Sequence, residues 1–135
     1  MKQRGMWVTV VFALLVAGCS FEPSRFDILQ ENSMANPTLS FAEPVGRSET
    51  EGDGNPWLGN ATFTQITTRF DDLPADTIDQ GLDELLIQAA DAGFELEGED
   101  FSGGGIRSEV WQGFNPQGIH LRMFVNCDGF QIELR

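Results

Sequence analysis

The chain has 135 residues, of which 21 are acidic and only eight are lysine or arginine, so its formal net charge at pH 7 is −13. A surface of that sign repels phosphate backbones and anionic lipid headgroups, which argues against nucleic acid as a partner.

The N-terminal residues have the pattern of a secretory signal. Lys2 and Arg4 precede an apolar run over 7–16, which is shorter than the roughly 20 residues that a membrane-spanning helix needs. Residues 16–19, Val-Ala-Gly-Cys, then resemble a bacterial lipobox at each position. The alternatives are an uncleaved membrane anchor, or a signal cut by the ordinary peptidase with Cys19 incidental.

The lipobox resemblance implies where the protein lies and how it is held there. Residues 1–18 would be a signal peptide, and Cys19 would carry a diacylglycerol. Through that lipid the protein would be anchored to a membrane of the bacterial cell envelope, on its extracytoplasmic side. The two acyl chains suffice for stable anchoring.

Cleavage would leave all 21 acidic residues but only six arginines, a formal charge of −15. Cys127 would then be the one thiol that remains, so no intramolecular disulfide is expected. We expect Cys127 to be a small buried side chain on a strand, in preference to a reactive nucleophile.

Residues 19–55 are rich in Ser, Glu, Pro, Asn and Gly and have few large apolar side chains. Such a composition does not offset the entropy of ordering, so we expect a flexible acidic tether. One patch over 26–29 can form a helical turn, or rest on the domain or on the membrane. Acidic residues over 49–60 approach calcium-loop spacing, but a solvated linker is favoured because the last ligand position is Asn60.

Residues 56–135 are expected to form one small α+β domain, with a single helix on a mainly antiparallel sheet. Thr, Phe and Ile over 61–70 predict a strand. Apolar residues at helical spacing over 78–90, followed by Gly93, predict a helix. Three strands after residue 105 complete the predicted order β-α-β-β-β.

Two turns set the predicted register of these three strands. Asp128-Gly129 indicates a two-residue hairpin, which pairs Val125 with Ile132. A turn over 115–118 pairs Phe114 with Ile119 and Met123 with Val110. The face predicted to pack on the helix carries Ile119, Leu121, Met123, Val125 and Cys127.

The opposite face is the candidate binding face, because arginines and aromatic residues converge there in a very acidic chain. In the predicted register Arg122 lies across from Trp111, which suits cation–π stacking. The alternative is that the tether or another layer covers this face, and that its arginines only pair with Glu109 and Glu133. The candidate residues are Arg107, Trp111, His120, Arg122, Phe124 and Arg135.

The sequence therefore favours a non-enzymatic binding or accessory module, with a protein or small molecule as the ligand. We expect no cofactor, metal or catalytic residue, since no zinc-ligand or nucleophile motif surrounds His120, the one histidine. The alternatives are a small hydrolase that uses His120 or a pair of carboxylates, and a structural envelope protein.

Overall fold

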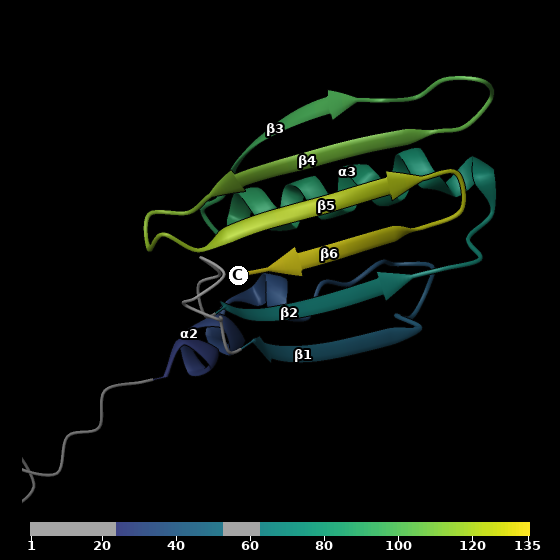
Figure 1. The fold of residues 1–135 in the computed structure, drawn as a ribbon. Coiled ribbons are helices and arrows are strands. Elements are labelled where there is room, and N and C mark those ends of the chain that lie inside the picture. The colour runs from purple at the N-terminus through teal and green to yellow at the C-terminus, as the bar shows by residue number, and fades with distance from the viewer. Residues whose placement is uncertain (1–23, 53–62) are drawn as a thin grey trace, which may run out of the picture.

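The computed structural model describes residues 24–52 and 63–135; the expected signal segment, Cys19 and the stretch 53–62 lie outside these ranges. The described residues form an α+β structure, a six-stranded antiparallel sheet with one main helix along one face (Figure 1), which confirms the predicted class. The elements are α2 (Arg25–Glu31), η1 (Ser33–Ala35), β1 (Gly46–Gly52), β2 (Phe63–Phe70), η3 (Ala75–Thr77), α3 (Ile78–Asp91), β3 (Glu95–Asp100), β4 (Ser108–Phe114), β5 (His120–Asn126) and β6 (Phe130–Leu134).

The order of strands across the sheet is β1-β2-β6-β5-β4-β3. The connection through α3 leads from β2 to the far edge, and consecutive hairpins then return from β3 until β6 pairs with β2 (Figure 1). The predicted order β-α-β-β-β is wrong because it lacks β1 and β3. In the described part of the chain these two strands are the edges of the sheet, and edge strands rich in charge avoid pairing with other molecules.

Residues 24–52, expected as a flexible tether, fold onto the domain. The Ser24 hydroxyl accepts from the Asp27 N–H, and the Asp27 carboxylate accepts from the Ser24 N–H, both at 3.2 Å, which fixes the start of α2. Widely spaced apolar side chains then enter the core: Leu29, Met34, Ala35 and Leu39. The tether prediction is wrong for this stretch, and the predicted boundary at residue 56 falls between two paired strands, β1 and β2.

The predicted helix α3 is confirmed. Gly93 follows it at φ 86°, as expected of a left-handed stop, and the Phe94 N–H bonds back to the last turn at 3.0 Å. At the start of the helix, the Thr77 hydroxyl donates to the Pro74 carbonyl at 2.6 Å and does not cap α3. The stripe buried against the sheet includes Ile78, Leu82, Leu85 and Ala89.

The β5–β6 hairpin is offset by two residues from the predicted register, since Val125 pairs with Phe130. The turn residues are Cys127 and Asp128, and the Asn126 N–H closes the turn on the Gly129 carbonyl at 3.1 Å. A shift of two keeps each strand residue on its predicted face. Leu121, Met123 and Val125 are therefore buried as expected. Cys127 is exposed in the turn, so its predicted burial is wrong.

The β4–β5 hairpin is offset by one residue, which has a larger effect. The Asn115 N–H donates to the Ile119 carbonyl at 3.0 Å, and Gly118 at φ 77° ends a loop of three residues. Phe114 consequently pairs with His120. An odd shift moves the whole of β4 to the other face of the sheet.

The core lies between the sheet and the helices. Phe70 and Phe130 are among its largest buried side chains, and both face α3 from paired positions on β2 and β6. Over residues 24–52 and 63–135, none of the helices has the length and apolar character needed to cross a bilayer.

Candidate functional site

We call the side of the sheet away from α3 the open face, because no helix of the described residues packs on it (Figure 1). The strand pairing determines which side chains project from it. They are Ser48 and Thr50 of β1, Gln65, Thr67 and Arg69 of β2, Gln131 and Glu133 of β6, with Arg135 just beyond, His120, Arg122, Phe124 and Asn126 of β5, Ser108, Val110, Gln112 and Phe114 of β4, and Glu95, Glu97 and Glu99 of β3.

Four of the six predicted binding residues lie together on this face: His120, Arg122, Phe124 and Arg135. Trp111 does not, because the one-residue offset pairs it with Met123 on the helix side, where it packs against the core and lies close to Gly98 of β3. Arg107 also lies on the helix side. The predicted stacking of Arg122 on Trp111 is wrong, and Arg122 lies over the Phe124 ring instead, with its guanidinium carbon 5.2 Å from the ring centroid.

A largely buried carboxylate stands at the centre of the open face. Glu133 is only 9% exposed, and its two oxygens have separate neighbours. One accepts a hydrogen bond from Gln131 at 3.1 Å, and the other lies 3.4 Å from the Arg122 Nε and 3.9 Å from an Arg135 nitrogen. The Arg122 Nε and this second oxygen attract as charges without an aligned hydrogen bond. Glu133 therefore attracts two guanidinium groups to the middle of the open face.

Arg135 is held from a third strand as well. Its Nε donates to the Gln65 side-chain oxygen at 2.7 Å, which links β2 to the end of β6. Guanidinium groups held in this way lose little further entropy when a ligand binds, and such preorganisation favours affinity.

An aromatic pair borders these arginines. The Phe114 and His120 rings lie 4.7 Å apart between centroids with planes tilted by 34°, and Phe114 is 62% exposed. A shallow depression of about 610 Å³ opens beside them, with Glu95 and Glu97 on its far wall. The face therefore offers apolar, cationic and anionic groups side by side.

The charge state of His120 follows from its surroundings. Partial burial lowers the pKa of His120, and the positive charges of Arg122 and Arg135 lower it further, against a smaller opposing effect of Glu133. The ring is consequently neutral at pH 7, and one nitrogen can donate a hydrogen bond while the other accepts.

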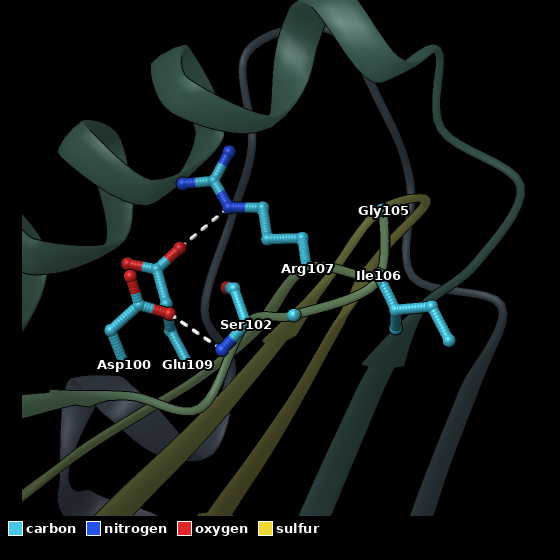
Figure 2. Close-up of a pocket in the computed structure, with 7 residues that line it drawn as sticks. Asp100, Ser102, Gly105, Ile106, Arg107 and Glu109 are labelled. Atoms are coloured by element: carbon cyan, nitrogen blue, oxygen red, sulfur yellow. Dashed lines mark hydrogen bonds and ion pairs between the residues drawn. The ribbon is translucent and has the colours of Figure 1, made fainter.

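Arg107 belongs to a separate cluster at the β3–β4 loop. Its guanidinium contacts Asp79 of α3 at 2.8 Å and Glu109 at 2.5 Å, and these partners raise the pKa of Arg107. Figure 2 shows the side chain reaching toward the helix above an open depression of about 670 Å³, with Asp100 bonded to the Ser102 N–H beside it. Because Arg107 is neutralised by two carboxylates, we interpret it as a residue that joins α3 to the sheet.

In the part of the chain that the structure describes, no three His, Cys, Asp or Glu side chains are grouped to hold a metal ion. The His120 ring meets Phe114, and its backbone pairs with Arg135. The chemistry that the open face itself offers is stacking, ion pairing and hydrogen bonding.

Sequence reasoning missed two parts of this face, Phe114 and the acidic row of β3. Both were lost with the register of β4. The signal that could have found them is Gly118, since glycine at the end of Asn-Pro-Gln-Gly suits a three-residue hairpin loop with a left-handed last residue. Comparison of the chain with protein-family models, curated proteins and solved structures finds no match.

Proposed function

We propose that this protein is a lipid-anchored, non-enzymatic binding module of the bacterial envelope that captures a protein partner on its open face. The observation that carries the proposal is the group formed by Phe114, His120 and Arg122. The exposed Phe114 ring packs on the His120 ring, and the guanidinium of Arg122, which is ion-paired with Glu133, lies near His120. Aromatic and arginine side chains dominate the energetics of protein interfaces. The breadth of the face and the shallowness of its depression suit a protein better than a small molecule.

The balance of charge supports a specific partner surface. The open face has Arg122 and Arg135 around Glu133, whereas β3 carries Glu95, Glu97 and Glu99 along its edge. A partner that matches both would carry acidic groups opposite the centre and basic groups opposite β3. Such an arrangement fixes orientation and excludes partners of uniform charge.

The proposal is tested with a matched pair of phenylalanines. Phe114 is 62% exposed on the open face, and Phe101 is 61% exposed on the β3–β4 loop. Purified wild-type protein and the variants Phe114→Ala, Arg122→Gln and Phe101→Ala are each used to capture proteins from solubilised envelope membranes.

We expect one discrete species with the wild type and with Phe101→Ala, and its loss with the two open-face variants. Melting temperatures near the wild-type value show that the variants are folded. Equal capture by all four proteins would place the interface elsewhere. The absence of any discrete species would favour a purely structural protein.

The anchor is tested separately. If the thiol of Cys19 carries the lipid, Cys19→Ser moves the protein from the membrane fraction to the soluble one, and the mass of the wild-type chain exceeds that of the chain beginning at Cys19 by the lipid. An unmodified Cys19 in the mature protein would contradict the anchor and leave the binding experiment unaffected.

A further inference from the structure

We infer that the protein is seated directly on the membrane, with the end of the sheet that carries α2 and the β4–β5 turn against the lipid headgroups. This inference rests on the proposed lipid at Cys19. It adds which surface meets the bilayer and in which direction the open face points.

The first step is the length of chain between the lipid and the folded domain. The capping box at Ser24 marks the start of α2, and in the sequence only Ser20 to Pro23 separate it from Cys19. Five peptide units span at most about 17 Å even when fully extended. The domain therefore cannot move far from the headgroups, unlike a domain on a tether of 37 residues.

The second step is where α2 begins on the domain. An Arg25 nitrogen donates to the Arg135 carbonyl at 3.0 Å and reaches the Gly118 carbonyl at 3.5 Å. These contacts place the start of α2 beside the β4–β5 turn and the end of β6, at one end of the sheet (Figure 1). The short connection brings that end, and not the opposite one, to the bilayer.

The third step is the charge of the two ends. At the membrane-facing end, the β4–β5 turn and the connection over 92–94 carry no charged side chain, α2 carries Arg25 with Asp27 and Glu31, and β1 ends beside Glu51. The connections at the opposite end contain acidic residues: Asp71 and Asp72 after β2, Asp100 at the end of β3, and Asp128 between β5 and β6. An orientation that turns these carboxylates outward lowers their repulsion from anionic headgroups.

The consequence is that the strands run roughly along the membrane normal, and the open face is roughly perpendicular to the membrane plane. β5 runs from His120 to Asn126, which is about 20 Å at 3.3 Å per residue. His120 and Phe114 then lie nearest the headgroups and Asn126 farthest from them. A partner of the open face would be bound beside the protein, close to the same membrane.

Cys127 provides a reporter for the far end, because it is exposed in the β5–β6 turn. The full-length lipidated protein is reconstituted in phosphatidylethanolamine–phosphatidylglycerol vesicles and labelled at Cys127 with a thiol-reactive fluorophore. A second protein carries Cys127→Ser with Gln117→Cys, so that its label lies in the β4–β5 turn. A quencher attached to the lipid headgroups reports which label is closer to the bilayer.

We expect severalfold stronger quenching of the label at position 117 than of the label at position 127. A control protein carries a Gly/Ser insert of about 30 residues between Pro23 and Ser24, which adds a mean reach of about 30 Å. In this control the quenching at position 117 should fall to the level at position 127. Melting temperatures verify that the labelled proteins are folded.

Two results would overturn the inference, and they are distinguishable. Equal quenching at both positions, or stronger quenching at 127, in a protein that floats with the vesicles would refute the orientation while leaving the anchor intact. Failure of the full-length protein to float with the vesicles would refute the anchor and, with it, this inference.

Discussion

Replacement of Leu29 by alanine tests whether the segment before β2 is part of the folded domain. Leu29 is fully buried, and its side chain belongs to the same core cluster as α3 and the sheet. Truncation of a buried leucine to alanine costs about 3 kcal/mol, from lost transfer energy and the cavity left behind. A domain of this size has a free energy of unfolding of about 5–15 kcal/mol, so the loss is a large share.

The assay is urea unfolding followed by far-ultraviolet circular dichroism. With a denaturant slope of about 2 kcal/mol per molar, the Leu29→Ala midpoint should fall by about 1.5 M. Ile87→Ala is the matched control, because Ile87 is 62% exposed on α3. Its free energy of unfolding should stay within about 0.5 kcal/mol of the wild-type value. A Leu29→Ala midpoint equal to that of the control would refute the docking of α2. For the same reason, a chain that begins at Pro56 should lack a cooperative transition.

Two further predictions concern pH and strand packing. The pKa of His120 is lower in the folded protein than in the unfolded chain, so the stability that the neutral ring contributes is complete above the unfolded value of about 6.5 and declines as the pH falls through it. In the variant His120→Gln, the melting temperature should depend less on pH between about pH 7.5 and 5.5 than in the wild type. The same dependence of melting temperature on pH in both proteins would show that the folded structure does not perturb the ring. A Cβ at Gly113 would lie far inside contact distance of the Glu95 carbonyl oxygen, whereas one at Gly46 meets open space. Gly113→Ala should therefore lower the free energy of unfolding by about 1–3 kcal/mol while Gly46→Ala leaves it nearly unchanged, and similar melting curves for the two variants would contradict the close approach of β3 to β4.

The elements that the sequence predicts well are those in which burial imposes a regular pattern. α3 has one apolar stripe, so its existence, its buried face and its stop at Gly93 all follow from residue spacing. The apolar side of β5 is equally clear. Its alternation survived an error of two residues in the β5–β6 turn, because an even shift leaves the faces unchanged.

The failures have a different physical origin. β1 and β3 are edge strands with little burial, so no apolar alternation marks them in the sequence. The apolar residues of 29–39 that enter the core are widely spaced along the chain. Because polar residues lie between them, the composition of this stretch predicted a flexible tether. The face of β4 depended on whether one loop holds two residues or three, and Trp111 on one side and Phe114 on the other gave no preference.

The place of β6 in the middle of the sheet has a consequence for how the chain is made. β6 follows every other strand in sequence, yet it joins β2 to β5 and so connects the two halves of the sheet. Pairings between residues so distant in sequence form late and slowly in folding. Until β6 has been synthesised, the earlier strands have no central partner and cannot close a stable core. A polypeptide with this topology therefore completes its core only after its last strand has been synthesised.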